Sequence, residues 1–489
     1  MTAYPGPVDM KHHEEGTTAR LFIRNSVMLV SIEMVSKVLG VVFFALLARF
    51  LGARELGIYG FGVALANFFV LAPRFGFDRL AQKEIGRTSV VNSGHLVEIS
   101  VIKGAFSIVA FGLFLITLII MKSGQILILS LITAFIFTYA YIEYIYSLFR
   151  GLKRAELEVM VRTFFSVSNL AIGVAALQQG YHLPGVVAAQ LGCLGASLLL
   201  ALFFLRRFTI KVPAELKWRQ LKKHVTGAAP FAGILLALYF SNQMGVLILA
   251  AFKGEVEVGY FAAAMKLFDN LTLIAAAVMG AFLPMMSEFH GNESSEAFSH
   301  ALRFTMKHLF VLAAPVAAGT VILALPIATF LYGSSFAPAA PSLRILGAAL
   351  IFNFWNYAAD TVLIAVNREG LVFRLTCLGA FVHIAANLIL VPSLGSLGAA
   401  WATLVTQTIY FVLLFIYLKR YVVVGTLLRD VLGPAWCSLI MGAILFVLDR
   451  FPLVVAVSGG AAIYLTALLL SGSVSRAELG LLRNLLHKQ

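Results

Sequence analysis

The sequence predicts an all-α membrane protein that crosses the bilayer about fourteen times. Hydrophobic residues make up 60% of the 489 residues, charged residues only 12%, and the mean hydropathy is +0.92. Apolar runs of about 20 residues, the length a helix needs to cross a bilayer, recur along the whole chain. We expect two six-helix lobes, related by a pseudo-two-fold axis along the membrane normal, plus two C-terminal helices.

Fourteen apolar segments have the length of a membrane-spanning helix. They cover residues 25–48, 57–77, 97–121, 125–149, 158–178, 184–205, 226–251, 258–284, 306–331, 339–366, 371–391, 396–418, 430–448 and 452–471. The first 24 residues are polar and carry acids as well as bases, unlike a signal peptide, so we expect the first span to be retained. The expected parts are an N-terminal segment (1–24), an N-lobe (25–210), a basic linker (211–225), a C-lobe (226–418), the last two spans (419–471) and an amphipathic tail (472–489).

The distribution of basic residues predicts the orientation. If the N-terminus is cytoplasmic, 27 of the 37 Lys and Arg residues fall on the cytoplasmic side and six on the outer side. The net charge of +14 therefore mainly reflects the excess of basic residues on the cytoplasmic side of the membrane, and nothing favours a nucleic-acid partner. We expect both termini to lie in the cytoplasm and membrane lipids to surround the spans.

The connections between spans exclude several classes of protein. The longest inner connections have about twenty residues and the outer ones about a dozen, too few for a soluble catalytic or nucleotide-binding domain. A membrane glycosyltransferase or polymerase, which needs a substantial catalytic loop, is therefore disfavoured. The three cysteines lie in apolar spans without metal-ligand spacing, so neither a metal site nor a cofactor is predicted.

An internal repeat supports the two-lobed architecture. "FLGARELG" at 50–57 aligns with "FKGEVEVG" at 252–259 at an offset of 202, and each lies at an outer junction between two spans. A weaker echo pairs 183–191 with 396–404. Because six spans separate the copies, an even number, both copies keep the same orientation in the membrane.

The segments at 48–87 and 331–407 carry a resemblance to a known family. With their loose pattern of Gly, Ala and a few charges, they resemble the polysaccharide transporter (Wzx-like flippase) family of the multidrug/oligosaccharidyl-lipid/polysaccharide exporter superfamily. The resemblance implies two six-helix bundles around a central cavity, and a flippase that moves undecaprenyl-diphosphate-linked oligosaccharide (an O-antigen, capsule or exopolysaccharide unit) to the periplasmic leaflet. It also implies a location in a bacterial inner membrane, and a polysaccharide polymerase and chain-length machinery as partners.

A lysine inside the first span is the leading candidate for substrate binding. Helix geometry places Lys37 about 18 Å from the cytoplasmic end, near the bilayer midplane. Glu33 and Lys37, four residues apart, either neutralise each other to pin the helix or line a watery cavity, and the cost of a charge at this depth favours the cavity. "SKVLG" at 36–40 is also similar to the Ser-Arg-x-x-Gly pattern of the MurJ lipid II flippases, although the aspartate expected after that pattern is absent.

The second lobe offers a counterpart. Lys266, Asp269 and Asn270 share one helix face, and we expect Lys37 and Lys266 to face each other and bind the diphosphate. The remaining substrate-binding candidates, near the cytoplasmic mouth, are Arg74, Arg79 and Lys103.

Intramembrane acids are candidates for ion coupling. Asp360 shares a face with two asparagines and a tyrosine, and with Glu33, Glu143 and Asp269 it could bind a proton or Na⁺, or instead serve only structural hydrogen bonding. We expect His383 and Asn387 to form an interhelical polar contact. The predicted mechanism is alternating access without covalent chemistry. A multidrug antiporter or a lipid II flippase of the same superfamily is the alternative, although cationic drugs favour acids over the lysines seen here.

Overall fold

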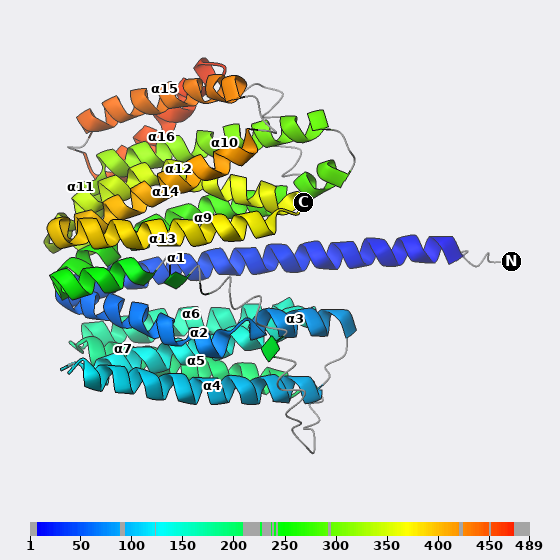
Figure 1. Ribbon diagram of the computed structural model, residues 1–489, viewed down its shortest axis with the longest axis vertical. Coiled ribbons are helices and arrows are strands. Elements are labelled where there is room, and N and C mark those ends of the chain that lie inside the picture. Colours follow the sequence, from blue (N-terminus) through cyan, green and yellow to red (C-terminus); the bar gives the residue numbers. More distant parts are fainter. Residues whose placement is uncertain are drawn as a thin grey trace. The chain divides into compact units, whose positions relative to one another are not determined.

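The computed structural model describes residues 7–88, 93–122, 124–208, 225–226, 236, 239–240, 243–291, 295–419, 424–448 and 451–473. Within these ranges all regular structure is helical, and twelve helices are long and apolar enough to cross a membrane (Figure 1). The all-α polytopic fold predicted from hydropathy is confirmed.

Two features account for twelve spans where the sequence predicts fourteen. Helix α1 (Pro7–Phe69) contains the first expected span and most of the second, residues 57–69, and the non-helical backbone of Gly52 separates them. Half of the expected span at 226–251 lies outside the described residues, which include the shorter apolar helix Gln243–Lys253.

The chain forms two compact units that do not coincide with the predicted lobes. Unit 1 comprises residues 1–43, 69–235 and 485–489, and unit 2 comprises residues 44–68 and 236–484. The last five residues of the expected first span (44–48) and residues 57–68 of the expected second span therefore belong to unit 2. The expected domain boundaries stay a prediction.

Unit 1 is built around α5, which packs against α7 and α3. Its core contains Phe77, Ile99, Phe149 and Leu194. Besides the first part of α1, its helices are α2 (Leu71–Arg74), α3 (Phe77–Thr88), α4 (Ser93–Ile120), α5 (Ile126–Gly151), α6 (Ala155–Gln178) and α7 (Leu183–Leu205). Helix α3, which is polar and too short to cross a membrane, was not among the expected spans.

Unit 2 is centred on α12, which packs against α9, α10 and α14 (Figure 1). Its inner face supplies much of a core that includes Leu346, Leu350 and Phe354. The elements of this unit are α9 (Glu255–Gly291), α10 (Ser295–Ile322), α11 (Ala324–Tyr332), the 3₁₀ helix η1 (Ser334–Ala339), α12 (Ala340–Ala365), α13 (Glu369–Leu394), α14 (Ser396–Leu418), α15 (Val424–Leu448) and α16 (Leu453–Leu470). The last two helices form an apolar pair on the α10 side.

The repeated outer junctions meet inside unit 2. Gly52 and Gly254, equivalent under the 202-residue offset, have φ values of 76° and 78°, a conformation in which L side chains are strained. Gly57 lies against the carbonyl of Glu255, and Gly259 lies against the carbonyl of Ala53. Under the offset of 202, Gly57 corresponds to Gly259 and Ala53 to Glu255, so each junction makes the same contact with the other. The two junctions therefore pair with local two-fold symmetry. Only glycine allows backbones to approach this closely.

Candidate functional site

Glu33 and Lys37 form an ion pair on α1, as their spacing predicts. Nζ of Lys37 lies 3.3 Å from Oε1 of Glu33, and the two side chains are 39% and 54% exposed. The pair lies within a span, where charged groups are not left facing lipid. The exposure therefore fits a hydrated surface better than a lipid-facing one.

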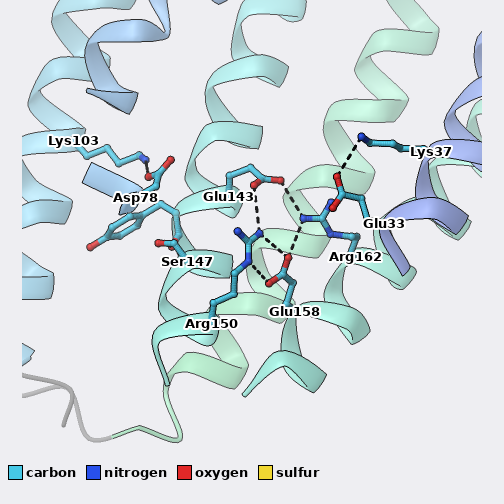
Figure 2. A network of polar contacts seen from close by, with 10 residues as sticks. Glu33, Lys37, Asp78, Lys103, Glu143, Ser147, Arg150, Glu158 and Arg162 are labelled. Carbon is cyan, nitrogen blue, oxygen red and sulfur yellow. Dashed lines mark hydrogen bonds and ion pairs between the residues drawn. The ribbon is translucent and has the colours of Figure 1, made fainter. Parts of the chain in front are cut away.

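The face of α1 next to this pair packs against α6. Oγ of Ser166 donates a hydrogen bond to Oγ of Ser36 at 3.0 Å. Two turns further along both helices, Gly173 packs directly against the ring of Phe43. Both contacts have the same offset of 130 residues, so the helices run in the same direction. This register brings Arg162 of α6 to the level of Glu33, as Figure 2 shows.

Two arginines and two glutamates form a charge-neutral cluster between α5 and α6 (Figure 2). Arg150 binds both carboxylate oxygens of Glu158, at 2.7 and 2.8 Å. Arg162 reaches Glu158 at 3.0 Å and Glu143 at 3.4 Å, and its guanidinium lies 4.9 Å from the Tyr146 ring centroid. Glu158 is almost fully covered, at 2% exposure, so its charge depends on these partners for stabilisation. Glu143, an ion-coupling candidate, is thus engaged by arginines.

Lys103 is fully buried in a cage of its own. Its ammonium lies 2.6 Å from Oδ1 of Asp78 and over the rings of Tyr144 and Tyr141, 4.8 and 5.8 Å from their centroids. Arg74, at the end of α2, acts electrostatically on the same ammonium, and Arg79 is exposed on α3. The three basic residues expected at one mouth therefore lie close in the fold, but Lys103 is held by an acid.

In unit 2, Lys266 lies on α9 with its ammonium 5.4 Å from the centroid of the Phe44 ring. Nδ2 of Asn270 donates to the Lys266 carbonyl at 2.5 Å, which fixes the amide beside the lysine. Asp269 is exposed on the same helix. Lys37 belongs to unit 1 and Lys266 to unit 2, and the expectation that the two lysines face each other stays a prediction.

Asp360 stands at the end of a hydrogen-bond chain that crosses three helices. Oη of Tyr410 on α14 donates to Oδ1 of Asp360 on α12 at 2.8 Å, and the same hydroxyl lies 3.2 Å from Oγ1 of Thr376 on α13. One turn away, Nδ2 of Asn356 donates to the side chain of Gln407 at 2.7 Å. The carboxylate therefore has a defined position with one oxygen occupied by a neutral donor.

His383 makes the interhelical contact that the sequence predicts, because its Nδ1 lies 3.2 Å from Oγ1 of Thr406 on α14. Asn387 instead donates to the His383 carbonyl in its own helix.

Sequence reasoning did not single out Arg150, Glu158, Arg162 or Asp78. One signal was present, since Glu158 and Arg162 are four residues apart at the start of an apolar helix. The pairing of Asp78 with Lys103, across 25 residues and two helices, left no local signal.

This arrangement defines a multi-pass helical membrane protein with charged side chains within its spans. The sequence profile of the polysaccharide biosynthesis protein family matches residues 22–290, more than half of the chain, and the chain belongs to that family.

Two curated relatives share part of the sequence. A probable low-salt glycan biosynthesis flippase of Haloferax volcanii is 26% identical over 42% of this chain and 44% of its own length. An uncharacterized membrane protein of Methanocaldococcus jannaschii is 24% identical over 39% of this chain and 37% of its own. The chain thus spans less than half the length of either curated relative.

Solved structures share the fold over most of the chain. The lipid II flippase MurJ in an inward closed conformation superposes with a TM-score of 0.68 and 17% identity, covering 90% of this chain and 98% of that chain. An inward-facing multidrug resistance transporter of the MATE family gives 0.58 and 15% identity, covering 81% and 98%. At these identities the likeness establishes the fold alone.

Proposed function

We propose that this protein is a flippase that carries an undecaprenyl-diphosphate-linked oligosaccharide from the cytoplasmic to the periplasmic leaflet of a bacterial inner membrane. Family membership and the similarity to a probable glycan biosynthesis flippase support this class of substrate. The fold shared with two membrane transporters supports a transport mechanism without covalent chemistry. With the cytoplasmic N-terminus predicted from basic residues, both termini face the cytoplasm.

The observation that carries the proposal is the exposed Glu33–Lys37 pair inside the first span. Two charges near the midplane are costly unless water or a polar ligand reaches them. At this depth an ammonium group can give a diphosphate a charge-assisted hydrogen bond that water screens only weakly. Lys37 therefore becomes the proposed diphosphate ligand, and Lys266 and Asn270 stay proposed substrate-binding residues of unit 2.

The basic residues at the mouth divide into two roles. Arg79 is exposed on α3 and Arg74 lies at the end of α2, where an entering headgroup would pass. Lys103 is completely covered and bound to Asp78, so we assign it to holding α3 against α4 rather than to the substrate. We likewise assign Glu143 to a structural role, because it pairs with Arg150 and Arg162.

Ion coupling is assigned to Asp360, with Asp269 and Glu33 as further candidates. A carboxylate that receives one hydrogen bond from Tyr410 keeps lone pairs for a proton or Na⁺. Uptake of a cation there would change the charge of unit 2 during each cycle.

Alternating access would require the outer contact between Gly57 and Gly259 to separate. In such a cycle the polar headgroup crosses the cavity while the polyprenyl chain stays in lipid. The exposed apolar surfaces of α15 and α16 suit that chain. A polymerase and chain-length machinery would consume the product.

A lipid II flippase or a multidrug antiporter of the same fold is the second candidate function. The lysines at positions 37 and 266 favour an anionic ligand over a cationic drug.

The test is translocation of a fluorescent lipid-linked oligosaccharide in proteoliposomes, with and without H⁺ and Na⁺ gradients. We expect transport by the natural protein and its loss in Lys37→Met. The double variant Glu33→Gln with Lys37→Met removes the unpaired glutamate that the single variant leaves. Continued loss in the double variant supports a ligand role, whereas full recovery would show that Lys37 serves only the helix bundle. Absence of transport by the natural protein would refute the proposed function.

A further inference from the structure

A second cation lies at the level of the Glu33–Lys37 ion pair of α1. Ser36 of α1 is hydrogen-bonded to Ser166 of α6, which marks the contact between the two helices. Glu33 comes three residues before the first serine, and Arg162 comes four residues before the second. Because residues three or four apart share a helix face, Glu33 and Arg162 each lie about one turn from this contact, on the same side of it. In the view of Figure 2 the Glu33 carboxylate lies between the Lys37 ammonium and the Arg162 guanidinium.

Arg162 is the less tightly paired arginine of the cluster between α5 and α6. Arg150 makes two short hydrogen bonds with Glu158, at 2.7 and 2.8 Å. Arg162 makes one with Glu158 at 3.0 Å and a longer one with Glu143 at 3.4 Å. With Arg162 turned away, Glu158 would keep both hydrogen bonds from Arg150, and Glu143 would keep the same arginine 3.9 Å away. The side chain of Arg162 is also 15% exposed, so the cluster does not enclose it completely.

The Glu33 carboxylate opposes the ligand that Lys37 is proposed to bind. Nζ of Lys37 lies 3.3 Å from Oε1 of Glu33, so a phosphate group on the same ammonium would bring two anions close together. Like charges this close repel each other even at the effective dielectric constant of a protein surface. A Glu33 that loses Lys37 would also be an unpaired carboxylate within a span, which is costly. Binding of a diphosphate to Lys37 therefore favours a second cation for Glu33.

We propose that Glu33 exchanges Lys37 for Arg162 when the diphosphate binds. This inference rests on the proposed function, in which Lys37 is the diphosphate ligand. Arg162 is then a positioning residue, because it does not touch the substrate but receives the carboxylate that the substrate displaces. Before binding, Glu33 holds the Lys37 side chain in place, and on its return it competes with the diphosphate and favours release.

The experiment is a double-mutant cycle on the binding of undecaprenyl diphosphate to the full-length protein in detergent. Native mass spectrometry gives the bound fraction over a lipid titration, and thermal unfolding shows that each variant is folded. The cycle comprises Arg162→Gln, Glu33→Gln and the variant with both changes. Arg162→Lys keeps the positive charge. The matched control is Arg154→Gln, which removes an exposed arginine that precedes the same helix.

We expect Glu33→Gln to bind about tenfold more tightly, because no carboxylate competes with the diphosphate for Lys37. Arg162→Gln should bind about tenfold more weakly, because the displaced Glu33 has no second cation. In the Glu33→Gln background the same change at Arg162 should alter binding less than about twofold, since no carboxylate is left to receive. Arg162→Lys should restore most of the affinity, and Arg154→Gln should leave it unchanged.

Two outcomes would overturn the exchange while the proposed function stands. One is an equal loss from Arg162→Gln in both backgrounds, which would show that Arg162 only supports the helix bundle. The other is unchanged or weaker binding by Glu33→Gln, a variant that leaves the α5–α6 cluster intact and so tests the competition even if Arg162→Gln does not fold. If the folded natural protein does not bind undecaprenyl diphosphate, the proposed function itself fails, and the exchange fails with it.

Discussion

The close contact between Gly57 and Gly259 predicts that one added methyl group will shift the equilibrium between the closed and the open form of this contact. A Cβ atom on Gly57 would lie 1.7 Å from the Glu255 carbonyl oxygen, and one on Gly259 would lie 1.9 Å from that of Ala53. Ordinary contacts begin near 3.4 Å, so the backbones must separate by about 1.5 to 1.7 Å. Because both clashing groups are backbone, no side chain can rotate away to relieve them.

Overpacking of this kind costs about 1–3 kcal/mol. If the outer contact opens during transport, Gly259→Ala should destabilise the closed contact by this amount and shift the equilibrium toward the open one by about 5- to 150-fold. Gly60→Ala is the matched control, because its Cβ would meet the Ala262 methyl at an ordinary 3.4 Å.

Disulfide formation reports the contact directly. The Cβ positions of residues 60 and 262 are close enough for a disulfide with small adjustment. In a background with the three natural cysteines replaced by serine, we expect Gly60→Cys with Ala262→Cys to cross-link readily on oxidation. Adding Gly259→Ala should lower the yield, and complete cross-linking should stop transport in proteoliposomes. Undiminished transport by fully cross-linked protein would refute the assignment of this contact as a gate.

Three further predictions concern the intramembrane charges. Asp78→Asn should lower the free energy of unfolding by about 3–5 kcal/mol because it leaves the Lys103 ammonium buried without its acid. Lys103→Met should lower the free energy of unfolding by less, because Asp78 is partly hydrated, and equal losses measured by chemical denaturation would contradict this. Glu158→Gln should destabilise by about 3 kcal/mol, whereas Glu156→Gln, in an exposed pair, should cost under about 1 kcal/mol, and a reversed order would refute the cluster's role. Asp360→Asn should reduce gradient-driven transport while substrate binding persists; unchanged transport would return Asp360 to a purely structural role.

Much of the fold could be predicted because the signal is local. The expected span at 184–205 corresponds to α7 (Leu183–Leu205), and the span at 396–418 matches α14 (Ser396–Leu418). A bilayer requires each crossing segment to satisfy its own backbone, so length and hydropathy define a helix without knowledge of its neighbours. The span expected at 306–331 was less accurate, because the chain divides there into α10 and α11 around Leu323.

The candidate site was predicted less completely. The Glu33–Lys37 pair follows from one turn of one helix, and the structure contains it. The cluster of Glu143, Arg150, Glu158 and Arg162 depends on α5 meeting α6, and hydropathy carries no information on which helices are neighbours.

The sequence by itself determined the helical membrane fold, the family and the equivalence of the two outer junctions, since each is recorded in residue types along the chain. The tertiary structure alone decided that Lys103 is enclosed by Asp78 and tyrosines, and that an ion pair between Arg303 and Asp430 joins α10 to α15. It also decided that Gly57 and Gly259 each pack against the backbone of the other junction. The physical reason is the same in each case. A charge or a glycine acquires its role from the group it meets in space, and that group lies on another helix.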